Sequence, residues 1–329
     1  MEESKVSLLE IDALTVEYRT DDAIVHAVND LDLRLDKGET RGLVGETGAG
    51  KTTLALSVLR LLPERVGHIA GGSIRYEGRE LLQMPEAEML ALRGKRISMI
   101  FQDPMTSLNP THTVGDQILE VLNLHFPEMT KQQKEAKVDE MMTLVGIPPS
   151  RKTDFPHQFS GGMKQRIVIA MALVAEPELL LADEPTTALD VTIQAQILEL
   201  IRNLKNQFHT AVLLITHDLG VVAEFCDTVS VVYAGRVVEY GTVEAVFEKK
   251  NNHPYTAGLF GCIPDLKDDQ PRLHPIAGRM SDPRVVHEGC CFCDRCDHAM
   301  ERCKTVAPAM HVHKGHGIAC HLFENREDF

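Results

Sequence analysis

The feature that most restricts the fold of this chain is a glycine-rich segment between a short apolar run and a helical pattern. The segment fits the pattern G-x-x-x-x-G-K-S/T with the residues Gly45, Glu46, Thr47, Gly48, Ala49, Gly50, Lys51 and Thr52. Glycines let the backbone wrap around a phosphate with its N–H groups turned inward, and a following helix directs its N-terminus at the anion. Because residues 42–44 are typical of a strand and residues 52–62 of a helix, we predict a phosphate-binding loop in an α/β fold rather than an ordinary glycine turn.

Two carboxylates follow a second apolar run. Residues 179–182 predict a buried strand, which would bring Asp183 and Glu184 to the carboxyl edge of a sheet, where open α/β folds bind ligands. With a phosphate loop upstream, we expect Lys51 to contact the β- and γ-phosphates and Thr52 and Asp183 to bind Mg²⁺. Glu184 would then polarise the water that attacks the γ-phosphate.

Further strands are predicted on both sides of these segments. Leu31, Leu33 and Leu35 alternate with charged residues, which is the period of a half-buried strand in an N-terminal antiparallel region. Residues 212–215 are apolar throughout, as a buried parallel strand should be. Residues 229–233 and 236–240 predict a hairpin.

A helical pattern covers residues 117–146, where Thr130 and Gln133 form a capping box and Gly146 suits the position after the last turn. We interpret about 102–165 as a helical insertion into a parallel core sheet. Beyond about residue 246 prolines become frequent and long apolar stretches rare, which indicates a small loop-rich extension. The predicted domains are therefore 1–245 and 246–329.

Composition excludes some classes of protein. The formal charge is −14 and tryptophan is absent, so a nucleic-acid partner is not expected, because phosphate backbones favour lysine and arginine. No apolar run reaches the ~18 residues that cross a bilayer. The N-terminus also lacks the pattern of a secretory signal, so we expect a cytoplasmic protein.

A second glycine motif opens the helical stretch 167–175. Ser160 is a good N-cap residue, and Gly161 and Gly162 let the backbone approach an anion, with Gln165 one turn further on. These residues resemble the signature motif of ABC ATPases, and the chain departs from its usual Leu-Ser-Gly-Gly-Gln form only at the first and fifth positions.

Other residues match further motifs of that family in the same order. Gln102 resembles the Q-loop glutamine, which contacts Mg²⁺, and His217 the switch histidine, which contacts the γ-phosphate. Asp190 resembles the D-loop aspartate, and Tyr18 the aromatic that stacks on adenine. The nucleotide-binding residues that the resemblance implies are Tyr18, Gly45, Glu46, Thr47, Gly48, Ala49, Gly50, Lys51, Thr52, Thr53, Gln102, Ser160, Gly161, Gly162, Gln165, Asp183 and Asp190. It implies hydrolysis of MgATP between two such domains, with Lys51, Gln102, Glu184 and His217 as the catalytic residues.

One branch of the family resembles this chain over nearly its whole length. Residues 99–110 and 183–196 resemble the ATPases of oligopeptide and dipeptide importers, the second segment in its D-type form, and 253–256 and 276–278 fall where that branch's extension begins. The resemblance implies a peripheral subunit on the cytoplasmic face of the cell membrane. Its implied partners are a second ABC ATPase subunit (an F-type paralogue or a second copy), two integral-membrane permease subunits and an extracytoplasmic solute-binding protein.

In this family a short helix of the membrane subunit rests against the Q-loop and the insertion. The resemblance thus implies docking around residues 102–109, with Met105 and Leu108 as the apolar contacts.

Six of the eight cysteines lie between residues 290 and 320, and in a reducing cytosol such a cluster indicates metal before disulfides. The branch's tail pattern maps onto Cys290, Cys296, Cys303 and Cys320, and related subunits are associated with a 4Fe–4S cluster there. Four thiolates suit zinc as well. The chain departs from the pattern by adding Cys291 and Cys293.

Three alternatives remain open. The motor could serve nickel or another small solute instead of peptides. A soluble ABC ATPase of translation or DNA repair is less favoured, because those proteins usually carry two ATPase domains, a coiled-coil insertion or basic surfaces. A metal-dependent regulator with a degenerate ATP site is disfavoured, because the matched motifs are intact.

Overall fold

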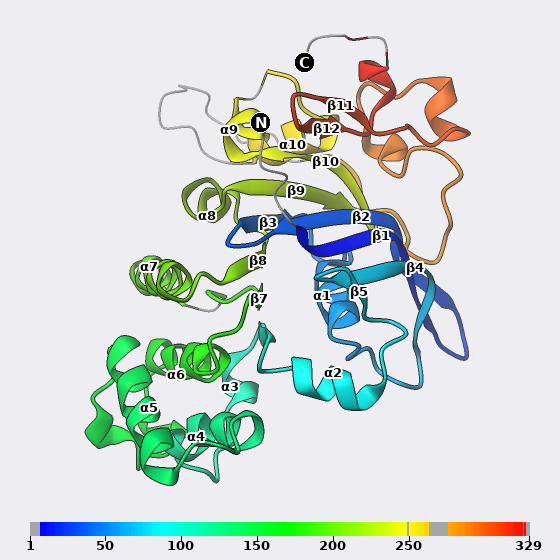
Figure 1. Ribbon diagram of the computed structural model, residues 1–329. Helices are drawn as coiled ribbons and strands as arrows, with labels where there is room; N and C mark the ends of the chain where they lie inside the picture. The colour runs from blue at the N-terminus through cyan, green and yellow to red at the C-terminus, as the bar shows by residue number, and fades with distance from the viewer. Residues whose placement is uncertain (1–6, 188, 249, 263–275, 325, 327–329) are drawn as a thin grey trace, which may run out of the picture. The chain divides into compact units, whose positions relative to one another are not determined.

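The computed structural model describes residues 7–187, 189–248, 250–262, 276–324 and 326, and the chain forms two compact units (Figure 1). One, here called the helical unit, comprises Met1–Leu8, Leu35–Thr40 and Gln83–Ile215. The other, here called the β-rich unit, comprises Leu9–Arg34, Arg41–Leu82 and Thr216–Phe329.

The β-rich unit contains an antiparallel sheet with the strand order β2-β1-β4-β5. Its strands are β1 (Ser7–Arg19), β2 (Ile24–Asp36), β4 (Gly67–Tyr76) and β5 (Arg79–Glu80). Leu31, Leu33 and Leu35 of β2 are buried while Asp32 and Arg34 between them are exposed, so the predicted N-terminal strand is confirmed.

A second group of strands in this unit begins at the strand before the glycine-rich loop. β3 (Thr40–Val44) runs parallel to β9 (Thr228–Tyr233), and β10 (Arg236–Thr242) pairs antiparallel with β9, as the predicted hairpin required. The described residues from 276 onward, here called the tail, add two short strands. β12 (His316–Ile318) pairs with β10, and β11 (His311–His313) pairs with β12.

The α-helices of the β-rich unit are α1 (Lys51–Val58), α8 (Leu219–Phe225), α9 (Val243–Phe247) and α10 (Pro254–Gly261), with single 3₁₀ turns at Cys293–Arg295, Glu301–Lys304 and His321–Phe323. Three aromatic rings join these segments in one core. The ring centre of Tyr233 on β9 lies 4.7 Å from that of Tyr255 on α10 and 5.1 Å from that of Phe292 in the tail. The tail therefore shares its core with β9 and α10.

The helical unit contains three parallel strands: β6 (Ile97–Ile100), β7 (Leu179–Asp183) and β8 (Ala211–Thr216). The parallel strands predicted at 179–182 and 212–215 are thus confirmed. Its α-helices are α2 (Glu86–Leu92), α3 (Pro104–Ser107), α4 (Val114–His125), α5 (Lys131–Leu144), α6 (Gly161–Leu173) and α7 (Val191–Phe208), with 3₁₀ turns at Pro149–Arg151 and Pro156–Gln158. In Figure 1, α4, α5 and α6 pack against one another.

One helical prediction was wrong in its extent. The pattern over 117–146 contains two helices, α4 and α5, and Pro127 lies in the break, where it could not donate to a continuous helix. The capping box is confirmed at the start of α5, where the Thr130 side chain accepts from the N–H of Gln133. Gly146 has φ of 74° after the last turn of α5, the left-handed conformation expected there.

Among the described helices, none combines the length and the apolar character that a bilayer span requires.

Candidate nucleotide site

The glycine-rich loop lies between β3 and α1, and two of its glycines admit no side chain. A Cβ on Gly45 would lie 2.2 Å from the carbonyl oxygen of Val232. One on Gly50 would lie 2.1 Å from that of Ala27, and Gly50 also has φ of 99°. The loop therefore runs against neighbouring backbone, and its close turn depends on glycine.

Lys51 is almost fully buried and folds back over the loop. Its ammonium group donates to the carbonyl oxygens of Gly45, at 2.7 Å, and Glu46, at 3.0 Å. Next to it, the hydroxyls of Thr53 on α1 and Tyr18 on β1 lie 3.1 Å apart, within hydrogen-bond distance. The structure thus brings Tyr18, Lys51 and Thr53, which the sequence placed in one site, to the same end of α1.

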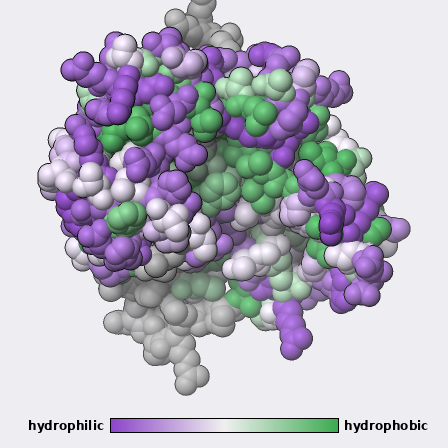
Figure 2. Space-filling model, turned by 90° about the horizontal axis from the view of Figure 1, so that it is seen from below, coloured by the Kyte–Doolittle hydropathy of each residue, from purple (hydrophilic) through white to green (hydrophobic). Residues whose placement is uncertain are grey.

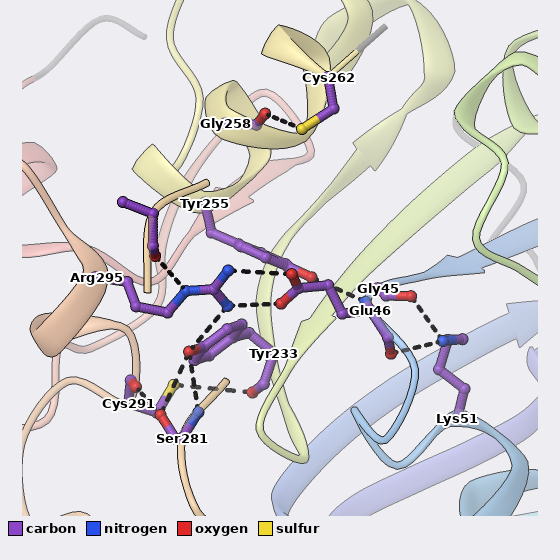
Figure 3. A network of polar contacts seen from close by, with 11 residues as sticks. Gly45, Glu46, Lys51, Tyr233, Tyr255, Gly258, Cys262, Ser281, Cys291 and Arg295 are labelled. Atoms are coloured by element: carbon purple, nitrogen blue, oxygen red, sulfur yellow. Dashed lines mark hydrogen bonds and ion pairs between the residues drawn. The ribbon is translucent and has the colours of Figure 1, made fainter. Parts of the chain in front are cut away.

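The loop is also held by two residues that sequence reasoning missed. The N–H of Glu46 donates to the hydroxyl of Tyr255, at 2.9 Å, and the Glu46 carboxylate forms an ion pair with Arg295 (Figure 3). Burial raises the pKa of Tyr255, so its hydroxyl stays protonated, and the hydrogen bonds with Glu46 raise the pKa of Arg295. These partners lie 209 and 249 residues from Glu46, and no local pattern indicates contacts at that separation.

In the helical unit, Asp183 ends β7 and is buried, and Glu184 follows it. Glu184 has φ of 47°, a left-handed conformation that is uncommon outside glycine and that clusters at functional sites. Its carboxylate accepts from the side chains of Gln102, at 2.9 Å, and Thr187, at 2.8 Å. The sequence had suggested Gln102 and Glu184 for the site, but not the contact with Thr187.

The second glycine motif lies at the start of α6. The Ser160 side chain accepts from the N–H of Met163, which confirms its predicted N-cap position. A Cβ on Gly162 would lie 2.8 Å from a methyl group of Ile193 on α7, so glycine allows the two helices to approach closely. Asp190 caps α7 by accepting from the N–H of Ile193, at 3.0 Å.

Gln165 is buried on α6, and within the described residues its side-chain oxygen accepts no hydrogen bond. His217 is exposed directly after β8, and the N–H of the next residue, Asp218, donates to the hydroxyl of Thr216. Ala188, between Thr187 and Asp190 in the predicted D-loop, lies outside the described residues.

Three of the six tail cysteines, Cys291, Cys303 and Cys320, are buried and the other three are half-buried; none of the eight cysteines of the chain, all of which are described, forms a disulfide. Burial raises the pKa of Cys290 to about 12, with smaller contributions from Cys291, Cys303 and Cys320. The pKa of Cys320 is raised in the same way, by burial first and then by Cys296 and Cys303. The four thiols of the predicted set therefore influence one another.

That proximity does not amount to a formed metal site. Across the described part of the chain, no three His, Cys, Asp or Glu side chains are arranged so that they could hold a metal ion. The predicted metal-binding extension is therefore not supported by this arrangement, in which burial raises the pKa of the Cys290 and Cys320 thiols.

Comparisons with known proteins agree with the motifs. Residues 28–187 match the family model described as "ABC transporter", and residues 238–303 match "Oligopeptide/dipeptide transporter, C-terminal region". The oligopeptide transport ATP-binding protein OppD of Salmonella typhimurium is 49% identical over 315 residues, which cover 95% of this chain and 93% of that protein. OppD of Haemophilus influenzae is 48% identical over 307 residues, covering 92% and 93%.

Solved structures extend the comparison to the fold. CbiO1 of Clostridium perfringens, described as part of an ABC transporter complex, is 27% identical, with a TM-score of 0.63 over 74% of this chain and 92% of that one. The ATP-binding cassette MJ0796, in a dimeric post-hydrolysis state with ADP and phosphate, has a TM-score of 0.64 over 71% of this chain and 98% of that one. At 24% identity, this second likeness concerns the fold alone.

Proposed function

The chain belongs to the ABC transporter family, in its oligopeptide and dipeptide branch, and we propose that it is the ATP-hydrolysing subunit that powers peptide import by ATP-driven dimer closure. The observation that carries this proposal is the 48–49% identity with oligopeptide transport ATP-binding proteins over more than nine-tenths of the chain. The same relatives favour peptides over nickel or another small solute. They also favour transport over a soluble role in translation or repair.

The roles of the site residues follow from the contacts around them. The ammonium group of Lys51 donates to loop carbonyls. With ATP bound, it would instead contact the β- and γ-phosphates. Glu184, oriented by Gln102 and Thr187, would position the attacking water as general base, and His217 would contact the γ-phosphate. Thr52, Gln102 and Asp183 would bind Mg²⁺, which neutralises charge on the phosphates.

The second glycine motif would act on the nucleotide of another chain. Ser160, Gly161 and Gly162 open α6, whose N-terminal N–H groups suit a γ-phosphate. Each chain carries one phosphate loop and one such helix, so two chains would complete two sites. The second chain would be an F-type paralogue or a second copy.

We place the chain on the cytoplasmic face of the membrane, bound to two permease subunits that work with a solute-binding protein. Docking would use the insertion at 102–165. Leu108, which the sequence suggested, is only 4% exposed, and the side chain of Met105 lies outside the described part. Leu124 within the insertion, at 69% exposed, and Phe101 directly before it, at 43% exposed, are the better candidates. Figure 2 shows hydrophobic patches among hydrophilic side chains on one face of the molecule.

The proposal is tested by expressing the chain with the membrane subunits of its own cell and purifying it through an affinity tag. We expect two permease subunits to copurify, and the reconstituted complex to take up peptides only with ATP. A chain that hydrolyses ATP but binds no membrane protein, with uptake unaffected by its deletion, would instead support a soluble ATPase.

We also propose that the tail takes up a metal centre, a 4Fe–4S cluster or alternatively zinc, through Cys290, Cys296, Cys303 and Cys320. Support comes from the backbone, because the N–H of Cys290 donates to the carbonyl oxygen of Cys303, at 2.7 Å, so that two of the four residues lie side by side. The thiols would need to rearrange and to release protons on binding.

Anaerobic purification should give a brown protein with roughly four iron and four sulfide per chain for the cluster, or a colourless one with stoichiometric zinc. Cys303→Ser should lower the metal content, whereas Cys262→Ser, outside the proposed set, should not. Metal-free protein with eight reactive thiols would refute both versions of the centre.

A further inference from the structure

The thiol-rich tail contacts the glycine-rich loop through a single carboxylate. The two terminal nitrogens of Arg295 donate to the two oxygens of Glu46, at 2.7 and 3.1 Å, in a two-point ion pair (Figure 3). The Arg295 side chain is 5% exposed and that of Glu46 is 32% exposed. Paired, partly buried charges of this geometry are screened less by salt than surface pairs and are more specific in direction.

Arg295 is fixed by the tail as well as by Glu46. Its Nε donates to the carbonyl oxygen of Ala277, at 2.9 Å, and its guanidinium carbon lies 5.7 Å from the ring centre of Tyr233. The Tyr233 hydroxyl is 3.3 Å from that of Ser281, which donates to the carbonyl oxygen of Cys291, at 2.8 Å. The guanidinium is therefore held at a set place relative to β9 and the cysteine-bearing segment.

Glu46 is held in both its backbone and its side chain. Its N–H donates to Tyr255 of α10, and its carboxylate is directed to Arg295. A second tail residue lies close to the loop, because a Cβ on Gly48 would contact the terminal methyl of Met280 at 3.4 Å. The tail thus limits the conformations of residues 46–48.

The charge of Glu46 is the reason why this contact matters. A carboxylate in a loop that receives a triphosphate repels the ligand unless a cation neutralises it. Arg295 supplies that cation and also draws the carboxylate toward the tail.

We propose that Arg295 is a positioning residue for the phosphate loop: it neutralises and orients Glu46, so that ATP affinity depends on the cysteine-bearing tail. The inference rests on the proposed ATP site. Within the described residues, Arg295 donates to Ala277, Glu46 and Tyr233, so among the residues of the loop it acts through Glu46.

The test is a double-mutant cycle in the full-length chain, with the wild type, Arg295→Gln, Glu46→Gln and the double variant. Equilibrium binding of MgATP is the readout. Arg295→Gln leaves the Glu46 charge unpaired and should weaken binding on the order of tenfold, the size expected for a lost charged hydrogen bond. Removing the carboxylate as well, in Glu46→Gln with Arg295→Gln, should recover most of that loss. Arg295→Lys keeps the charge without the two-point geometry and should fall between Arg295→Gln and the wild type.

Arg302→Gln is the matched control. Arg302 lies in the same tail and forms a similar two-point pair, with Glu324, but that pair is exposed and both of its members belong to the tail. Arg302→Gln should leave ATP affinity unchanged. Thermal unfolding of every variant identifies any that fail to fold, and Arg295→Lys decides the question if Arg295→Gln is unstable, because wild-type affinity in Arg295→Lys would refute the inference.

The outcomes separate this inference from the proposed function. Wild-type protein that binds no ATP would overturn the proposed site itself. Wild-type binding with unchanged affinity in Arg295→Gln would refute the inference alone. Equal losses in Arg295→Gln and the double variant would show a structural contact without charge coupling, and would also refute it.

Discussion

The contacts around Glu184 indicate its chemical role. Its backbone is left-handed directly after β7, and the side chains of Gln102 and Thr187 both donate to one of its carboxylate oxygens. Two donors to one carboxylate restrict its rotation and leave it suited to orient a water molecule.

Replacing that carboxylate should separate binding from hydrolysis. In Glu184→Gln we expect MgATP binding to remain and turnover to fall by at least ~10²-fold, because the amide cannot accept a proton. Phosphate release and equilibrium nucleotide binding are the measurements. Glu199→Gln, an exposed glutamate on α7 of the same unit, is the control and should hydrolyse normally. Near wild-type turnover in Glu184→Gln would remove the role assigned here.

Individual residues also show the limit of sequence reasoning. Gly45, Lys51, Gln102 and Glu184 were found from motifs, because close backbone approach and phosphate charge select particular residue types at short spacing. Arg295 and Cys296 match an Arg-Cys pair in the tail pattern of the branch, but the contact of Arg295 with Glu46 was missed, because the two residues are 249 positions apart. A contact that forms only through tertiary packing leaves no local pattern in the sequence.

At the scale of elements, strands were predicted more reliably than helix ends. The continuous apolar runs of β7 and β8 and the alternation in β2 identified those strands, because burial selects both patterns. The division between α4 and α5 falls inside the stretch 117–146, whose pattern predicted helix without giving the limits of each helix. Pro127 and the cap at Thr130 were the local signs of two helices.

The buried His253 at the start of α10 should make the stability of the protein depend on pH. His253 is buried, and its Nδ1 accepts from the N–H of Tyr255, at 3.1 Å. Burial lowers its pKa to about 3, from about 6.5 in an unfolded chain. Below pH 6.5 the unfolded state therefore binds the extra proton, so stability falls as pH decreases toward 3, by up to about 1.4 kcal/mol per pH unit from this group.

Urea unfolding between pH 7 and pH 4.5 measures this effect. His253→Asn keeps an N-cap acceptor without the imidazole, and its stability should depend less on pH than that of the wild type. His209→Asn replaces an exposed histidine after α7 and serves as the control. Identical pH profiles for the wild type and His253→Asn would show that the buried imidazole does not set the acid limit.

The exposed apolar residue of α4 allows a test of docking. Leu124→Asp should abolish ATP-dependent uptake in the assembled complex, while the isolated chain keeps its hydrolysis rate, because the change adds charge to a surface and not to the core. Leu90→Asp, on α2 of the same unit and 58% exposed, is the control outside the insertion. Parallel losses of uptake and hydrolysis in Leu124→Asp would indicate a folding defect instead.

At the scale of the whole molecule, the proposed site would require two chains, because each chain carries one phosphate loop and one signature helix. Lys51→Ala and Ser160→Arg should each be inactive alone, because each removes a different half of every site. Mixed in equal amounts, self-pairing chains should regain about a quarter of the wild-type sites, since half of the pairs are mixed and each has one intact site. Recovery of phosphate release is the measurement. Folded chains that show no recovery would exclude self-pairing and favour a paralogous second subunit.

The pairing of β3 with β9 also sets an order of events during synthesis on the ribosome. Val44 lies opposite Val231, 187 residues later, so the strand that leads into the phosphate loop waits for its neighbour while the intervening chain is translated. At ordinary elongation rates this delay is roughly ten to forty seconds. During that time the edge of β3 that later pairs with β9 has no partner, and its free N–H and C=O groups are open to pairing with another chain.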